Sequence, residues 1–227
     1  IGTLSALFAH RLNQPLTVIQ LKLQQILRAM DTSSEFEPKV TECLEEARAT
    51  ADIVKDVLRY ARPSRAAQLT PVDFHSIAAK IATTFAVYST ESPLEINLDG
   101  LKDTGAILAA PEEWEETFFV FMENASHACR ENAHSTLTIS AVLLTDSYEV
   151  RFVDNCSGIS PEHLPHIFDL FYSTKPRTLG TGLGLSIVKQ MMTARGGKAT
   201  VQSTLGEGTT FIISMPLQRQ EYAMEHV

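Results

Sequence analysis

Apolar side chains recur at steps of three and four through the N-terminal quarter of the chain and predict two amphipathic helices. The first stretch has its apolar positions at Leu4, Phe8, Leu12, Pro15, Ile19, Leu23, Ile26 and Met30. Residues 31–35 are polar, and Ser34 followed by Glu37 resembles a capping box that begins a second helix. The second stretch has its apolar positions at Val40, Leu44, Ala47, Ala51, Val54, Leu58 and Ala61. The pattern therefore predicts a helical hairpin.

A hairpin of two helices cannot bury both apolar stripes alone. A homodimer in which two hairpins form a four-helix bundle would cover them. Arg62, Pro63 and Ser64 break the helical pattern. We therefore expect a dimerisation hairpin over residues 1–64.

The remaining pattern is mixed and predicts an α+β domain over residues 65–217. Strand-like alternation covers residues 95–98, 137–144, 148–153, 199–203 and 209–215. Helical periodicity covers residues 74–88, 111–132 and 183–194. Three helices on one face of a mostly antiparallel sheet would account for this order. Residues 218–227 are interpreted as a polar tail.

Composition narrows the classes of function. A net charge of −8 disfavours a nucleic-acid partner, because phosphate backbones are bound through clustered Lys and Arg. Apolar runs such as residues 118–122 are far shorter than the roughly eighteen residues of a membrane span. The chain begins without Met, so we expect an upstream part, which could include membrane spans. Its three cysteines, Cys43, Cys129 and Cys156, favour a reducing compartment, the cytoplasm, over a disulfide framework or a zinc site.

A candidate nucleophile lies in the first helix, in the segment AHRLNQPLT. His10 lies on the helix side opposite Phe8 and Leu12, and it shares that side with Gln14 and Thr17. We expect the imidazole to be exposed, and a neutral imidazole is a nucleophile suited to phosphoryl transfer. The simpler interpretation is that a lone surface histidine is only solvated.

A glycine-rich segment, GTGLGLSIV from Gly180, runs directly into a predicted helix. Backbone N–H groups at a helix start bind phosphate well. The preceding segment STKPRTLG carries Lys175 and Arg177 and could form a lid over an anion. Glycine-rich turns are also common without any ligand.

Two further segments carry polar side chains that suit a nucleotide. In DNCSGI, Asp154 ends a predicted strand and could accept a hydrogen bond from an adenine amine, while Gly158 allows a tight turn. In MENASHA, Asn124 shares a helix side with His127 and could hold a metal that bridges phosphates. An ordinary turn and an exposed asparagine are the simpler interpretations.

In this order, the four segments resemble the boxes of bacterial two-component sensor histidine kinases, and Phe168 and Phe171 match the phenylalanine box. HRLNQPLT is similar to the subgroup whose box reads His-Glu-Leu-Asn-Gln-Pro-Leu. The resemblance implies a dimerisation and phosphotransfer hairpin, followed by an ATP-binding α/β sandwich with a mixed sheet and three main helices. Gyrase and a heat-shock chaperone contain the same type of domain.

The resemblance also implies an activity and assigns residues to it. An ATP-dependent protein-histidine kinase would phosphorylate His10 from Mg-ATP and pass the phosphoryl group to an aspartate of a response-regulator receiver domain. Gln14 would position water for dephosphorylation of that regulator, and Asn124 would hold Mg. The expected nucleotide-binding residues are Asn124, His127, Asp154, Gly158, Lys175, Gly180, Thr181, Gly182, Leu183 and Gly184.

Three residues depart from the family pattern. Arg11 replaces the usual Glu or Asp that assists the histidine proton, a contribution of about 10² to 10⁴ in rate; its guanidinium could hold phosphate instead. Val120 replaces a further asparagine one turn before Asn124. Cys156 replaces a glycine, at a cost of about 1 to 2 kcal/mol if a left-handed backbone is required.

Two alternatives to an active kinase stay open. The departures are consistent with a degenerate or slow kinase that acts as a nucleotide-binding or partner-binding signalling module. A gyrase-like or chaperone-like ATPase clamp is the other alternative. The hairpin with its histidine weighs against a clamp, because a clamp has no use for an acceptor histidine.

Overall fold

The computed structural model describes residues 2–29, 36–61, 68–88, 94–129, 134–175 and 181–217, with the backbone alone for residues 2–15, 52, 55–61 and 87–88. The chain divides into two compact units. One unit comprises Ile1–Pro63 and His166–Ile187, and the other comprises Ser64–Pro165 and Val188–Val227.

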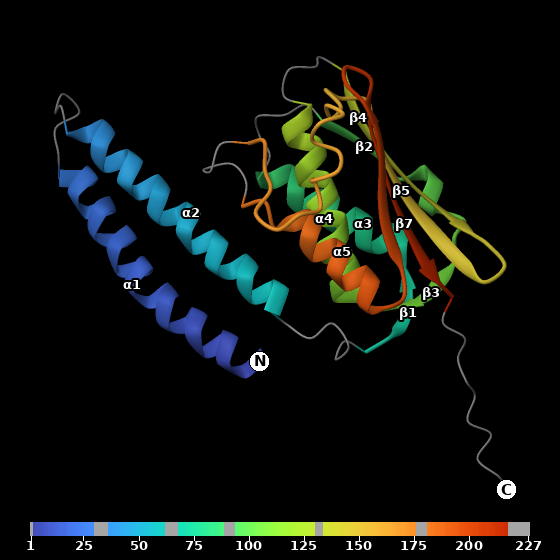
Figure 1. The fold of residues 1–227 in the computed structure, drawn as a ribbon, viewed down its shortest axis with the longest axis horizontal. Helices are drawn as coiled ribbons and strands as arrows, with labels where there is room; N and C mark the ends of the chain where they lie inside the picture. The colour runs from blue at the N-terminus through green and yellow to red at the C-terminus, as the bar shows by residue number, and fades with distance from the viewer. Residues whose placement is uncertain are drawn as a thin grey trace, which may run out of the picture. The chain divides into compact units, whose positions relative to one another are not determined.

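The first unit contains the predicted helical hairpin. Helices α1 (Gly2–Ala29) and α2 (Glu37–Ala61) pack side by side, as Figure 1 shows. Leu44, Ala47 and Val54 of the predicted stripe are buried. The Gln20 side chain donates a hydrogen bond to the Ala47 carbonyl oxygen at 3.0 Å. The capping residue Ser34 and the predicted linker Arg62–Ser64 lie outside the described residues.

The hairpin leaves part of its apolar surface exposed within a single chain. Among the α1 side chains that are described, those of residues 16–29, the exposed large apolar ones are Val18, Ile19, Leu21 and Ile26. Ile19 and Ile26 belong to the stripe that the periodicity marked as buried. One copy of α2 therefore covers only part of that stripe.

The second unit is built on a five-stranded sheet in the order β2-β4-β5-β7-β6. Its strands are β2 (Leu94–Asn97), β4 (Ser135–Leu143), β5 (Ser147–Asp154), β6 (Lys198–Thr204) and β7 (Gly208–Pro216). The β2–β4 pair is parallel and the other pairs are antiparallel. This arrangement confirms the predicted mixed, mostly antiparallel sheet.

Helices cover one face of this sheet (Figure 1). They are α3 (Phe74–Tyr88), α4 (Pro111–Ala128) and the second half of α5 (Gly184–Ala194). Alternate residues of β5 and β7 are buried, as expected for a sheet with one covered face. Aromatic rings form the core between these layers: the Phe121 ring centroid lies 4.2 Å from that of Phe152 and 4.8 Å from that of Phe211. The α4 helix is thereby fixed against β5 and β7.

Three short elements were absent from the prediction. Strands β1 (Thr70–Asp73) and β3 (Ala106–Ala109) pair as a separate antiparallel ribbon, and η2 (Asp99–Leu101) is a 3-10 helix. Both strands are short: β1 contains a proline, and β3 is uniformly apolar and shows no alternation. The η2 turn packs against β4, so that a Cβ on Gly100 would come within 2.5 Å of the Ser140 Cβ.

No helix among the described residues is long and apolar enough to cross a bilayer.

Candidate functional site

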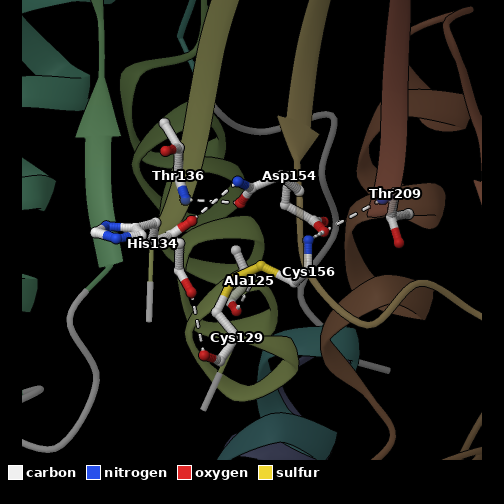
Figure 2. Close-up of a disulfide and its surroundings, with 9 residues drawn as sticks. Ala125, Cys129, His134, Thr136, Asp154, Cys156 and Thr209 are labelled. Atoms are coloured by element: carbon white, nitrogen blue, oxygen red, sulfur yellow. Dashed lines mark hydrogen bonds between the residues drawn. A yellow bond between two sulfur atoms is a disulfide. The ribbon is translucent and has the colours of Figure 1, made fainter. Parts of the chain in front are cut away.

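The Asp154 carboxylate is held at the end of a strand by two backbone hydrogen bonds. Asp154 ends β5 and pairs in register with Thr209 on β7. Its Oδ1 atom accepts hydrogen bonds from the backbone N–H groups of Cys156 at 3.0 Å and of Thr209 at 3.2 Å, as Figure 2 shows. The residue is only 7% exposed. The carboxylate is therefore held in one orientation at the end of the strand.

Burial also changes the acidity of this carboxyl group. Desolvation raises the pKa of Asp154 above its ordinary value, and the N–H groups of Cys156 and Thr209 only partly oppose this effect. Carboxyl groups whose pKa is perturbed by burial cluster at functional sites. The carboxylate suits a ligand that offers a neutral N–H donor, since such a donor compensates for the lost water.

The turn after Asp154 requires glycine at one position. Gly158 has φ +66°, and a Cβ there would collide with the Thr204 carbonyl oxygen. The turn is held against the β6–β7 connection, because Ile159 N–H donates to the Ser203 hydroxyl at 2.8 Å and Gly206 N–H donates to the Ser157 carbonyl at 2.7 Å. The predicted tight turn at Gly158 is confirmed.

Cys156 occupies this turn without the expected backbone strain. Among the described residues other than glycine, only Phe171 has a positive φ, so the anticipated cost of a left-handed Cys156 does not arise. Its sulfur is instead bonded to the sulfur of Cys129 at the end of α4 (Figure 2). The expectation that the cysteines would not form a disulfide is therefore wrong for this pair. The signal was missed because the residues are far apart in sequence and meet only when α4 packs beneath β5.

Asn124 and His127 lie on the last two turns of α4, and both are half-buried. The His127 Nδ1 atom lies 2.9 Å from the Glu123 carbonyl oxygen. Val120 is buried in the core one turn earlier, so this position supplies no metal ligand. No cluster of three or more His, Cys, Asp or Glu side chains that could hold a metal occurs in the described parts of the chain. An ion here would need other ligands beside the Asn124 amide oxygen.

The glycine-rich segment forms a tight turn that leads into α5. Gly182 has φ +70°, and a Cβ there would lie 2.5 Å from the Phe171 carbonyl carbon. Leu183 N–H donates to the Thr181 hydroxyl at 3.4 Å, and α5 begins at Gly184. The predicted helix start is confirmed within one residue. Gly180 and Arg177 lie outside the described residues.

The residues that precede this turn include Lys175 and the two phenylalanines. Lys175 is half-buried, and its backbone N–H donates to the Ser173 hydroxyl at 3.1 Å. Phe168 is half-buried, whereas Phe171 is exposed with φ +63°. A positive φ is rare for an aromatic residue. The sequence offers no signal for it; in the structure the Phe171 backbone lies close to Gly182.

The structure does not test the prediction that His10 is the phosphoacceptor. His10, Arg11 and Gln14 lie within α1, where the backbone alone is described. Their shared position on one helix side stays a prediction. The structure groups Asp154 with Gly158 in one turn, Asn124 with His127 on α4, and Thr181 with Gly182, Leu183 and Gly184 in another turn.

Comparisons with known proteins agree with this geometry. Residues 111–219 match the family model described as "Histidine kinase-, DNA gyrase B-, and HSP90-like ATPase". The sensor protein SrrB of Staphylococcus aureus is 27% identical over 217 residues, which cover 92% of this chain and 36% of SrrB. The chain thus spans about a third of the length of this curated relative.

Solved structures show the same fold. Full-length ShkA, crystallised in complex with AMPPNP, has a TM-score of 0.73 at 24% identity and covers 96% of this chain and 46% of its own. The mycobacterial sensor histidine kinase MprB has a TM-score of 0.54 at 19% identity and covers 66% of this chain and 98% of its own. The predicted fold class is confirmed.

Proposed function

The chain is related to the bacterial two-component sensor histidine kinases, as its boxes predicted, and from this premise we propose that it is an ATP-dependent protein-histidine kinase whose acceptor is His10. The observation that carries the proposal is the buried Asp154 carboxylate, held by two backbone N–H groups at a strand end of an ATPase-type domain. In this proposal residues 1–64 are the phosphotransfer hairpin and residues 65–217 are the catalytic domain.

Asp154 is the proposed adenine contact. Its Oδ1 atom already accepts two backbone N–H bonds, so the carboxylate cannot rotate freely. An exocyclic adenine amine would donate a further bond to this carboxylate. Gly158 keeps the following turn compact, because its backbone conformation and the nearby Thr204 carbonyl exclude a side chain.

The phosphates of ATP are proposed to bind at the glycine-rich turn. N–H groups at the start of α5 present positive partial charge, which suits phosphate oxygens. We assign Gly180, Thr181, Gly182, Leu183 and Gly184 to this role. Lys175 adds a positive charge. Asn124 offers an amide oxygen for Mg²⁺, a ligand type that the ion prefers, and Mg²⁺ supplies neutralisation of phosphate charge. His127, which lies on α4 like Asn124, is assigned to nucleotide binding as well.

The proposed transfer needs a nucleophile and a departing group. The neutral imidazole of His10 attacks the γ-phosphorus of ATP, a nitrogen–phosphorus bond forms, the bond to the bridging oxygen breaks, and ADP leaves. The phosphoimidazolium that forms then loses its ring N–H proton to water. Arg11 would hold phosphate oxygens through its guanidinium. The phosphoryl group then passes to an aspartate of a response-regulator receiver domain, and Gln14 positions water for the later hydrolysis of the phosphoaspartate in that regulator.

We propose that the hairpin dimerises. The exposed Val18, Ile19, Leu21 and Ile26 side chains give α1 an apolar surface that a second hairpin would cover. ATP is an intracellular substrate, so the proposal places the kinase domain in the cytoplasm.

A degenerate signalling module is the second candidate, and the buried Val120 favours it. A valine in the core cannot help to hold Mg²⁺ or its waters at the Asn124 end of the site. This candidate predicts nucleotide binding without appreciable phosphorylation. A clamp ATPase would instead release phosphate continuously without modifying itself.

The test is incubation of the chain with Mg²⁺ and γ-labelled ATP. An active kinase acquires acid-labile, alkali-stable label that disappears in His10→Ala and persists in the control His163→Ala. Asp154→Ala should reduce both ATP binding and labelling. Nucleotide binding without label would support the signalling module, and label that persists in His10→Ala would refute His10 as the acceptor.

A further inference from the structure

A disulfide joins the two segments that carry the proposed nucleotide contacts in the second unit. Cys129 caps the end of α4, and Cys156 lies two residues after Asp154. The two cysteines are separated by 27 residues in sequence, and their Cα atoms are 4.8 Å apart. Both residues are buried, at 0% and 1% exposure. The bond therefore lies within the folded unit (Figure 2).

Cys156 also supports the Asp154 carboxylate, which is the proposed adenine contact. The backbone N–H of Cys156 donates to Asp154 Oδ1 at 3.0 Å, so any movement of Cys156 changes the support of this carboxylate. On the other side, Cys129 N–H donates to the Ala125 carbonyl at 2.9 Å, within the turn of α4 that follows Asn124. The disulfide thus connects the helix that carries Asn124 to the turn that orients Asp154.

The surroundings also offer an acceptor to a free Cys156 thiol. The Cys156 sulfur lies 4.0 Å from the Ala125 carbonyl oxygen, which a thiol can use as a weak acceptor. Ser157 N–H donates to the Ala128 carbonyl at 3.4 Å, so one hydrogen bond joins the turn to α4 without the sulfur bridge. Reduction therefore removes the covalent tether and leaves a weaker one.

We propose that Cys129 and Cys156 are a site of reversible thiol oxidation that controls the affinity of the domain for ATP. The inference rests on the proposed nucleotide-binding function. In a reducing compartment, disulfides are usually transient and used for redox sensing, which suits a pair placed at a ligand site.

The oxidant is a low-molecular-weight disulfide. The thiolate of one cysteine attacks it, a mixed disulfide forms, and one small thiol leaves. The thiolate of the other cysteine then attacks the mixed disulfide, which releases a second small thiol. One small disulfide is reduced to two thiols, and the protein dithiol is oxidised to one disulfide. Because both sulfurs are buried, exchange requires local opening of the Asp154–Gly158 turn, and we expect slow equilibration.

The direction of the effect follows from the geometry. The disulfide restricts the turn and keeps the Cys156 N–H directed at Asp154. In the oxidised form the Asp154 carboxylate is therefore already oriented before ATP binds. Preorganisation of this type reduces the entropy lost on binding. We expect reduction to raise the Kd for Mg-ATP on the order of three- to tenfold.

The test equilibrates the full chain at graded ratios of oxidised to reduced glutathione. Thiol alkylation and peptide mass analysis measure the Cys129–Cys156 link, and calorimetry measures the Kd for Mg-ATP. The proposal predicts a link that forms and breaks reversibly, with tighter ATP binding when it is formed. Cys129→Ser, which leaves the Cys156 backbone in place, should bind ATP like the reduced protein at every ratio, whereas the exposed Cys43→Ser should respond like the wild type.

Two results would overturn the proposal: a link that never forms, or a Kd that is equal or lower in the reduced protein. If Cys129→Ser does not fold, the reduced wild type supplies the same comparison. A link that forms in a protein that binds no ATP in either state would refute the proposed nucleotide function and, with it, the coupling to ATP. Alkylation would then still establish the oxidation site, so the two failures are distinguishable.

Discussion

Glu113 at the start of α4 and Arg195 just after α5 form a two-bond ion pair within the core of the second unit. Arg195 Nε donates to Glu113 Oε2 at 3.1 Å, and Nη2 donates to Oε1 at 3.0 Å. Their side chains are only 14% and 10% exposed. The pair fixes the end of α5 to the beginning of α4, and it lies beside Tyr148, whose pKa is raised to about 12, chiefly by burial.

Removal of one partner of this pair should destabilise the domain strongly. We expect Arg195→Ala to lower the free energy of unfolding by about 3 to 5 kcal/mol, because Glu113 would be left as a buried charge without its main partner. Urea denaturation measures the change. The control is Lys80→Ala, which breaks the exposed Lys80–Glu115 pair and should cost at most about 1 kcal/mol. Equal effects of the two substitutions would contradict the assignment.

The buried Asp154 carboxyl should make stability depend on pH in a defined direction. Its folded-state pKa is raised from 3.8, so the folded protein keeps this proton to a higher pH than the unfolded chain does. The stabilisation of the fold by protonated Asp154 is fully present below pH 3.8, and it is lost as the pH rises through the folded-state pKa.

Asp154→Asn provides the comparison, since its amide oxygen can accept the same two N–H bonds without ionising. The stability of the wild type relative to Asp154→Asn should fall as the pH increases from 3.8, and then become constant. Denaturation of both proteins across this pH range tests the sign. A relative stability that rises with pH would show that the carboxylate is stabilised by its surroundings.

Substitution at position 11 tests the missing general base. Arg11→Glu restores the residue type of the related kinases and should raise the labelling rate by roughly 10²-fold, because a carboxylate can assist the proton of His10. Arg11→Gln removes the positive charge without adding a base and is the matched control. If the labelling rate rises equally in both variants, the positive charge of Arg11 is what slows the wild type. If neither rate differs from the wild type, position 11 does not control the rate.

The turn before α5 should be sensitive to a single methyl group. Gly182→Ala places a Cβ against the Phe171 backbone at φ +70°, so we expect a loss of Mg-ATP affinity and a lower melting temperature. Gly105→Ala has nearly the same φ, +69°, with no atom near the added Cβ. It should cost only the backbone strain, about 1 kcal/mol. Calorimetry measures the melting temperature and the Mg-ATP affinity of both variants, and the difference between them gives the effect of the collision with Phe171. Similar losses in both variants would contradict a role for this contact.

Long periodic elements were predictable because many residues repeat the same signal. The two hairpin helices, the four longer strands of the main sheet and the start of α5 all follow from such repeats, whereas the four-residue β2 was predicted without a long repeat. Strands β1 and β3 carry four residues each and depend on pairing with each other, which no local pattern shows.

The residue types of the site were predictable, but the contacts that hold these residues in place were less so. The end of β5 at Asp154 and the turn at Gly158 were expected from the sequence. The role of Thr209 N–H depends on the register of β7 with β5, and the Cys129–Cys156 bond depends on the packing of α4. Both are tertiary contacts between segments far apart in the chain, so the spacing of residues does not reveal them.

The packing of η2 against β4 protects the edge of the main sheet. Strand β2 pairs only with residues 135–138 of β4, so Ser140 lies beyond the reach of this short partner. Gly100 covers Ser140 closely because it has no side chain to hold η2 away. An uncovered edge would offer its N–H and C=O groups to strands of other molecules, a common beginning of aggregation. We therefore expect Gly100 in η2 to help keep separate copies of the domain from joining sheet to sheet.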